Sequence, residues 1–308
     1  MSNILAKAGK RLAGRWAVIG IPYAWLLFFF LVPFLIVIKI SLSEVTIAMP
    51  PYLPTIDLAE GWSSIRDAIS AFSFDNYIWL TEDDLYWKSY LSSIQIAAIS
   101  TLITLLAGYP LAYGMTRVPS HWRPTLVMLV ILPFWTSFLI RVYAWIGILK
   151  NEGLLNQFLL WVGVIDEPLI ILNTNWAVYV GIVYSYLPFM VLPLYATLEK
   201  MDDSLLEAAE DLGCPPWKAF WQITLPLSLP GVLAGSFLVF IPAVGEFVIP
   251  DLLGGSNTLM IGKTLWVEFF ANRDWPVSSA VAVILLLILV VPIVLFQNQQ
   301  QKMQERDK

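Results

Sequence analysis

The chain has 308 residues, of which 58% are hydrophobic and 13% charged, and its formal net charge is −5. Soluble domains are usually about 45–50% apolar and about 25% charged, so one globular core of this size cannot hide so much apolar surface and lipid must be the solvent for part of it. The single cysteine and the single histidine exclude an intrachain disulfide, a Cys- or His-based metal site and a His-driven triad, and no basic run suggests a nucleic acid.

Six apolar segments are each long enough to cross about 30 Å of hydrocarbon as a helix that rises about 1.5 Å per residue. A lone helix satisfies its own backbone groups in lipid, so we expect an all-α integral membrane protein with six transmembrane helices. The predicted spans are 17–41, 90–116, 125–149, 174–198, 229–250 and 276–296.

The first span follows a basic segment, as a secretory signal would, but its apolar run is too long for a signal core and no small-residue cleavage site follows. We therefore predict an uncleaved anchor after a tail of residues 1–16. Positive charge indicates the orientation, because cytoplasmic loops carry more Lys and Arg. Both termini, including the tail 297–308, are predicted to be cytoplasmic. The inner side would then hold Lys7, Lys10, Arg11, Arg15, Arg117, Arg123, Lys200, Lys218, Lys302, Arg306 and Lys308, against Arg66, Lys88, Lys263 and Arg273 outside.

This orientation makes the long connection 42–89 a periplasmic loop, and the loop is rich in acids. The acids could raise the local concentration of a cationic solute, contact an external binding protein, or simply form a solvated face. They are Glu44, Asp57, Glu60, Asp67, Asp75, Glu82, Asp83 and Asp84.

Two charges lie inside apolar spans, Arg141 in the third and Glu246 in the fifth. Each is about 16 or 17 residues from the inner end of its span, which places both roughly 25 Å across the membrane. Unpaired charges are costly in lipid, so an interhelical Arg141–Glu246 ion pair is expected, with a role at an outer gate or pathway as the alternative. Pro242, Gly245 and Pro250 around Glu246 would loosen the helix, as suits a gate or equally a simple kink.

Four aromatic residues near the spans could complement a cation through their ring faces. Aromatic residues in membrane chains usually serve packing or interfacial anchoring, so each has that plainer explanation as well. They are Trp135, Tyr143, Tyr184 and Tyr186.

A polar segment, 200–228, separates the fourth and fifth spans, and its residues predict a helical hairpin. Ser204 and Glu207 have the spacing of a capping box at a helix start. Gly213 fits a left-handed position at the helix end, and Pro215 with Pro216 prevents continuation. A second short helix is expected from Pro216. One apolar stripe is expected on the first helix, formed by Leu205, Ala208, Ala209 and Leu212.

The hairpin has two interpretations that these residue types do not separate. It could be an amphipathic pair of helices that lies on lipid head groups, or a rigid docking element for a cytoplasmic partner.

Seven positions of this hairpin carry a family resemblance. Their spacing is similar to the EAA motif of ABC importer permeases. The stretches 131–156, 181–195, 240–255 and 260–282 resemble the polyamine branch of that family, most of all the PotH-type permeases of putrescine importers, and the resemblance extends over essentially the whole chain from the first span. The seven motif positions are Glu207, Ala208, Ala209, Gly213, Ile223, Leu225 and Pro226.

The resemblance implies a type I (MetI-like) ABC importer permease fold, with a shared transmembrane domain at 90–296 and the span 17–41 added before it. It implies that the hairpin 200–228 couples to an ATPase, with Glu207 toward basic groups of that subunit and Gly213 setting the corner. The implied partners are a second permease of the same fold, a dimer of cytoplasmic subunits that bind ATP and Mg, and a periplasmic polyamine-binding protein. The protein itself is then a multi-pass component of a bacterial inner membrane.

No enzyme activity, cofactor or metal is expected in this chain. Gly262, Lys263 and Thr264 look like the end of a phosphate-binding loop, but that pattern needs glycine where Asn257 stands. A permease for spermidine or another small solute is the alternative within the family. A secondary transporter acting alone is the alternative from another class, although no two-fold repeat with matched broken helices is evident. A membrane-embedded enzyme is a third class, which no pair of intramembrane carboxylates or Ser–His set supports.

Overall fold

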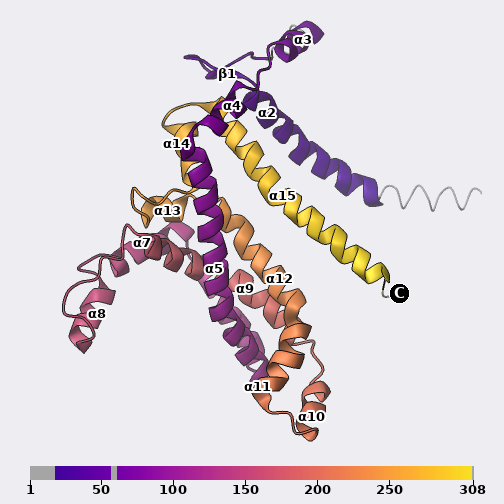
Figure 1. The fold of residues 1–308 in the computed structure, drawn as a ribbon, viewed down its shortest axis with the longest axis vertical. Helices are drawn as coiled ribbons and strands as arrows, with labels where there is room; N and C mark the ends of the chain where they lie inside the picture. The colour runs from indigo at the N-terminus through magenta and orange to yellow at the C-terminus, as the bar shows by residue number, and fades with distance from the viewer. Residues whose placement is uncertain (1–17, 57–60, 307–308) are drawn as a thin grey trace, which may run out of the picture. The chain divides into compact units, whose positions relative to one another are not determined.

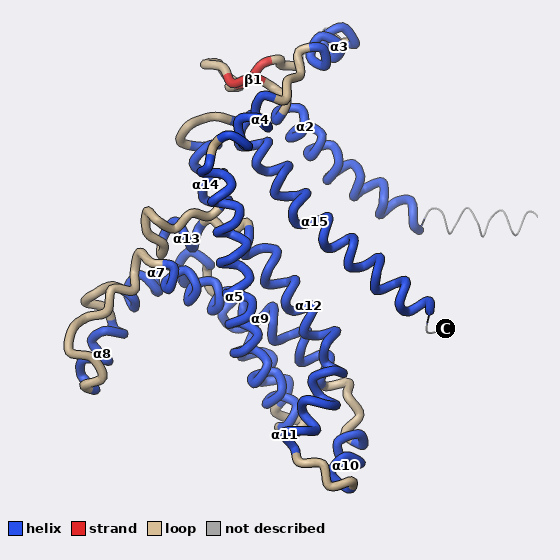
Figure 2. Tube along the Cα trace, in the orientation of Figure 1, coloured by secondary structure: helices blue, strands red, loops and turns tan. Residues whose placement is uncertain are grey.

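The computed structural model describes residues 18–56 and 61–306 (Figure 1). The predicted tail 1–16, with its orienting charges, lies outside the described residues, as do Asp57, Glu60 and Lys308. The chain contacts divide into two units, one that combines Met1–Asp83 with Val267–Lys308 and one formed by Asp84–Trp266. Helices make up most of both units (Figure 2).

The first predicted span is a helix in the first unit, Val18–Ser41, which includes the π-helical turn η1 (Leu27–Leu31) and α2 (Val32–Ser41). Its end is tied down, because the side-chain amide of Asn76 donates to the carbonyl oxygens of Ser41 at 2.9 Å and Ser43 at 2.8 Å. None of its most apolar 18-residue window is buried within the chain. Its apolar surface therefore needs lipid or another subunit to cover it.

The connection after this helix is more ordered than a simple loop. It contains an antiparallel strand pair, in which Glu44 lies opposite Leu53 and Val45 opposite Tyr52, and two helices. The C-terminal helix α15 (Trp275–Arg306) packs against α2 and against α4 (Asp75–Glu82), and it contains the predicted span 276–296. Asp274 begins this helix by accepting a hydrogen bond from the Val277 N–H at 3.0 Å. The other elements are β1 (Glu44–Val45), β2 (Tyr52–Leu53), α3 (Trp62–Ser70) and α4 (Asp75–Glu82).

The second unit is built on three long helices that pack against one another, α5 (Asp84–Arg117), α9 (Asn175–Leu198) and α12 (Leu225–Val244) (Figure 1). Small residues let their backbones approach, as is common for helices in membranes. A Cβ on Gly231 of α12 would lie 2.6 Å from Thr197 Oγ1 and 3.0 Å from the Pro193 carbonyl oxygen of α9. The predicted spans 90–116 and 174–198 are thus confirmed as helices that share one core.

The predicted single helix 125–149 is wrong. The chain forms α6 (Arg123–Ile131) and the 3-10 turn η2 (Leu132–Trp135), then extends through Thr136 and Ser137 and re-enters a helix. The two helical segments are bent by 88°. Pro133 lies at the break and cannot donate a backbone hydrogen bond, which explains why a continuous helix fails there. The segments after the break are α7 (Phe138–Leu149) and α8 (Leu154–Val162).

The predicted bounds 229–250 of the fifth span are also wrong. The helix runs without interruption from Pro216 to Val244, through α11 (Pro216–Ala219), the π-helical turn η3 (Phe220–Thr224) and α12. It stops at Gly245, and two shorter helices follow, α13 (Val248–Leu252) and α14 (Ile261–Phe270). Among the described residues, four helices are long and apolar enough to cross a membrane, or five if the bent pair forms one span.

Candidate functional site

The hairpin begins with α10 (Ser204–Asp211), and its start differs from the predicted capping box. Asp203, not Ser204, is the residue before the helix, and no side chain caps there. Ser204 is already helical, and its backbone N–H donates to Asp202 Oδ1 at 3.0 Å. This hydrogen bond holds the pKa of the Asp202 carboxyl below its ordinary value. A hydrogen bond to the side chain of Asp202 therefore stands at this helix start in place of the predicted capping box of Ser204 and Glu207.

The corner of the hairpin confirms the prediction for Gly213, which adopts a left-handed backbone with φ +74°. Its N–H donates to the Glu210 carbonyl at 2.8 Å, and the Cys214 N–H donates to the Ala209 carbonyl at 2.9 Å. These two bonds close the helix end in the Schellman arrangement. Pro215 is extended and Pro216 opens the next helix, as predicted.

The second helix of the hairpin is not short, contrary to the prediction. It is the first part of the long helix Pro216–Val244. The π-helical turn Phe220–Thr224 lies just before Pro226, whose nitrogen cannot donate, so the helix passes this proline instead of ending. Any displacement of the corner at Gly213 therefore acts directly on a helix of the three-helix core.

The predicted apolar stripe on α10 is mostly uncovered, with only Ala209 buried. Leu212 is 88% exposed, and Trp217 and Trp221 across the corner are 69% and 61% exposed. Clustered large apolar side chains in contact with solvent usually mark an interaction surface. Of the remaining motif positions, Glu207, Ala208, Gly213 and Pro226 are exposed, whereas Ile223 and Leu225 are half-buried.

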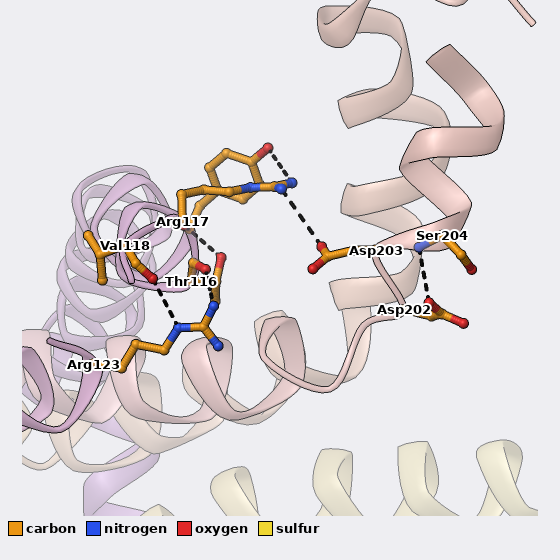
Figure 3. Close-up of polar contacts among 8 residues, drawn as sticks. Thr116, Arg117, Val118, Arg123, Asp202, Asp203 and Ser204 are labelled. Carbon is orange, nitrogen blue, oxygen red and sulfur yellow. Dashed lines mark hydrogen bonds and ion pairs between the residues drawn. The ribbon is translucent and has the colours of Figure 1, made fainter. Parts of the chain in front are cut away.

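One ion pair ties the hairpin to the end of α5, and a second joins α6 to α9 beside it, an arrangement that we call the hairpin junction. Figure 3 shows the first of these pairs and the contacts of Arg123 with the backbone. Arg117, at the end of α5, lies 3.8 Å from the carboxylate of Asp203 and donates to the Tyr113 hydroxyl at 3.0 Å. Arg123, at the start of α6, lies 3.7 Å from the carboxylate of Glu199 at the end of α9.

The backbone completes the hairpin junction. Arg123 also donates to the carbonyl oxygens of Thr116 at 2.8 Å and Val118 at 3.2 Å, and so it closes the turn between α5 and α6. Along the sequence, Arg117 and Arg123 indicate only the orientation of the chain. Their pairing with Asp203 and Glu199 depends on how the helix ends meet, which spacing along the chain does not show.

A cavity of about 580 Å³ lies among the end of η2, α7, α9 and the break between α12 and α13. Arg141, Tyr186 and Glu246 line it together. The structure thus brings together three of the six residues predicted for a substrate pathway or gate. The cavity also has aromatic walls that the sequence analysis did not single out, formed by Phe134, Phe138, Phe189 and Phe247.

The other three predicted pathway residues lie elsewhere. Trp135 and Tyr143 are 75% and 57% exposed. Tyr184 is half-buried, packs edge-on against Trp145 at 5.4 Å and lines a separate cavity of about 290 Å³. Only Tyr186, of the four aromatic candidates, contacts a charged candidate.

Glu246 does not sit inside a helix as predicted, because α12 ends at Val244 and α13 begins at Val248. One carboxylate oxygen accepts from the N–H groups of Val248 at 3.0 Å and Ile249 at 3.4 Å, and the other accepts from the Tyr186 hydroxyl. The side chain is only 7% exposed. Glu246 therefore caps α13 while it faces the cavity, and negative charge is favourable at such a helix start.

Arg141 does not form the predicted ion pair with Glu246. The described residues form the ion pairs Lys88–Asp84, Arg117–Asp203, Arg123–Glu199 and Lys263–Asp251, and Arg141 takes part in none of these. The Arg141 guanidinium lies 5.5 Å from the ring of Phe134 and 5.7 Å from that of Phe138, and its Nε and Nη1 have no hydrogen-bond partner within the described part of the chain. The carboxylate is held by Tyr186 and α13 instead.

Comparison with known proteins shows the family to which this chain belongs. Residues 15–304 match the family described as "Binding-protein-dependent transport system inner membrane component". The chain belongs to this family. It is therefore an ABC transport permease and a multi-pass protein of the inner membrane.

The permease has curated relatives of high similarity. It is 47% identical over 212 residues to the "Spermidine/putrescine transport system permease protein PotB" of Escherichia coli K12, which covers 69% of this chain and 77% of that protein. It is 40% identical over 269 residues to the PotB protein of Haemophilus influenzae, with 86% of each chain covered.

Solved structures confirm the predicted permease fold. A bacterial ABC transporter involved in the import of the acidic polysaccharide alginate matches 97% of the permease and 98% of its own chain, with a TM-score of 0.68 and 18% identity. The alginate transporter in complex with a periplasmic protein that holds an alginate pentasaccharide matches with a TM-score of 0.69, also at 18% identity, with 96% of each chain covered. At this identity the likeness concerns the fold alone.

Proposed function

We propose that this permease is one transmembrane subunit of an ATP-driven polyamine importer. The observation that carries the proposal is its 47% identity to PotB of Escherichia coli, a protein named for spermidine and putrescine transport. That name covers both polyamines. We take putrescine, which the sequence analysis favoured through its PotH-type resemblance, as the first substrate to test and spermidine as the alternative.

The hairpin 200–228 is the proposed coupling element. Its corner is fixed by Gly213 and Pro216, and it presents Leu212, Trp217 and Trp221 to a partner. The proposed partner is a cytoplasmic ATPase dimer that binds ATP and Mg, with Glu207 toward its basic groups. Because the long helix begins at Pro216, a push on the corner reaches the three-helix core along one rigid element.

The cavity at Glu246 is the proposed part of the solute pathway. A buried carboxylate beside aromatic walls suits an alkylammonium group, since the carboxylate attracts its charge and the ring faces contact both its charge and its methylenes. The second permease of the same fold would supply the other wall of the pathway. A periplasmic binding protein would deliver the solute.

Reconstitution into liposomes tests the proposal. The permease would be co-expressed with its second permease and ATPase subunits, and uptake of radiolabelled putrescine and spermidine would be measured with the binding protein outside. We expect uptake that needs ATP and stops with vanadate. Uptake by the permease alone, driven by an ion gradient, would instead support a secondary transporter.

A hairpin variant separates coupling from folding. Glu207→Arg should leave the permease in the membrane but reduce both co-purification of the ATPase subunit and uptake. Asp211→Arg is the matched control, because Asp211 is an exposed acid on the same helix outside the seven motif positions. Equal retention of the ATPase by both variants, with normal uptake, would refute the docking role.

A further inference from the structure

Arg141 is a buried cation whose hydrogen-bonding needs are unmet. Its side chain lines the cavity and the residue is 9% exposed, while Nε and Nη1 lack a partner among the described residues. The rings of Phe134 and Phe138 face the guanidinium but cannot accept conventional hydrogen bonds from it. Burying a charge without a hydrogen-bonding partner is unfavourable, so the working protein should offer Arg141 an acceptor during part of its cycle.

Among the residues that line the same cavity, Glu246 is the one with a carboxylate. Its carboxylate has about four lone-pair positions, of which the Tyr186 hydroxyl and two backbone N–H groups of α13 occupy three. One position is left for a cation that enters the cavity. A full pair with Arg141 would require Glu246 to give up Tyr186 or the start of α13.

We propose that Arg141 is a resident cation of this cavity that competes with the substrate ammonium for Glu246. In the arrangement described here, Glu246 is held by Tyr186 and α13 and can receive an ammonium. In the alternative arrangement Glu246 pairs with Arg141, and the ammonium loses its counter-charge and leaves. The identity of the substrate in this inference rests on the proposed polyamine function. The contact between Arg141 and Glu246 does not depend on it.

The fold makes such an exchange possible without unfolding a helix. Glu246 lies in the three-residue break Gly245–Phe247 between α12 and α13, and Arg141 is on the first turn of α7, just after the bend at Thr136 and Ser137. Both charges therefore sit next to backbone breaks, where segments can reorient by changing a few dihedral angles. Glu246 would then alternate between two sets of partners, Tyr186 with α13 in one state and Arg141 in the other.

Equilibrium binding and uptake test the competition. With the assembled transporter, Arg141→Gln should tighten binding of radiolabelled putrescine about tenfold, which corresponds to about 1.4 kcal/mol, and should slow uptake at saturating putrescine. Arg141→Lys keeps the charge and should behave like the wild type. Lys150→Gln is the matched control, since it removes a positive charge from the exposed residue that ends the same helix.

The effect of Arg141 should depend on Glu246. Glu246→Gln is expected to weaken putrescine binding, and adding Arg141→Gln to it should then change binding by less than about twofold. A tenfold tightening that persists without the carboxylate would overturn the inference, as would Arg141→Gln behaving like Lys150→Gln.

A cross-linking experiment tests the meeting of the two residues without any polyamine. Cys214 is the only cysteine, so Cys214→Ser provides a cysteine-free background for the pair Arg141→Cys and Glu246→Cys. Oxidation should form a disulfide in this pair and not in the control pair Trp135→Cys and Glu246→Cys, because Trp135 is exposed. A cross-link without polyamine uptake would reject only the proposed substrate. Uptake without a cross-link, and with no effect of Arg141→Gln, would reject only this inference.

Discussion

The guanidinium of Arg123 lies 3.7 Å from the carboxylate of Glu199, and this contact joins the start of α6 to the end of α9. The Tyr195 hydroxyl donates to the same carboxylate at 2.6 Å. The neighbouring pair, Arg117 and Asp203, connects α5 to the residue before α10. In the hairpin junction, one ion pair thus holds the start of α10 to the end of α5 and a second joins α6 to α9, whereas Gly213 and Pro216 fix the corner itself.

The first prediction concerns the Arg117–Asp203 pair. Both side chains are well exposed, at 43% and 76%, so the pair should contribute only about 0.2–1 kcal/mol to the free energy of unfolding. Asp203→Asn should therefore hardly change the thermal unfolding midpoint but should reduce the uptake gained per ATP hydrolysed. The swap Arg117→Asp with Asp203→Arg should restore part of that ratio. A midpoint that falls by many degrees in Asp203→Asn would show a structural role instead.

The second prediction concerns the corner of the hairpin. A left-handed backbone costs a residue with a Cβ roughly 1–2 kcal/mol, and a β-branched residue tolerates it poorly. Gly213→Val, at φ +74°, should therefore leave the protein in the membrane but distort the corner, with a loss of ATPase co-purification and uptake. Gly213→Asn is the control, because asparagine adopts this conformation more readily. Wild-type coupling in Gly213→Val would argue against a fixed corner.

The third prediction concerns helix packing in the three-helix core. An added Cβ at Gly231 would lie 2.6 Å from Thr197 Oγ1, so Gly231→Ala should destabilise the fold by about 1–3 kcal/mol. Gly114, on α5, has nothing within 4 Å of an added Cβ. Gly114→Ala should be neutral or stabilising by up to about 1 kcal/mol, because alanine favours a helix. Thermal unfolding in detergent compares the two variants, and a Gly231→Ala protein as stable as Gly114→Ala would contradict the packing.

The fourth prediction concerns Asp274, whose carboxylate accepts from the Val277 N–H at the start of α15. Burial raises the pKa of Asp274 above its ordinary value, so the charged form is the less favourable one in the folded protein. Stability linked to this group is thus greatest below the unfolded pKa of 3.8 and is lost as the pH rises through the folded value.

Asp274→Asn tests that sign. Asparagine caps a helix about as well as aspartate and carries no charge, so the variant should unfold at a higher temperature than the wild type at pH 7. The difference should shrink as the pH approaches 3.8. Asp274→Ala is the control for the cap itself and should be about 0.5–2 kcal/mol less stable than Asp274→Asn at either pH. A wild type that is more stable than Asp274→Asn at pH 7 would show that the charge stabilises the helix start.

Predictions from the sequence were correct where the chemistry of a few neighbouring residues fixes the backbone conformation. Gly213 and the two prolines after it predicted the corner and the start of the second helix, because a left-handed position and a missing N–H act within a few residues. Long apolar runs likewise predicted the helices Val18–Ser41 and Asn175–Leu198 nearly to the residue.

Predictions from the sequence failed where a helix break depends on the elements packed around it. Hydropathy continues through Pro133 and Gly245, so it did not reveal the bend after η2 or the end of α12. The expected Arg141–Glu246 pair failed for the same reason. It assumed two unbroken helices, whereas Glu246 lies in a break and binds the start of α13. The aromatic walls at Phe134 and Phe138 followed from this bend and could not be selected beforehand.

The sequence by itself determined that the chain is a helical membrane protein with one polar, sharply turned hairpin, because composition, helix length and backbone chemistry are local properties. Only the tertiary structure decided which charges meet. Arg117 pairs with Asp203, and Arg123 pairs with Glu199, because the ends of α5, α6, α9 and α10 converge at the hairpin junction. Arg141 stayed unpaired beside a carboxylate already held by Tyr186, since the strength of an ionic contact depends on separations of a few ångströms that no spacing along the chain encodes.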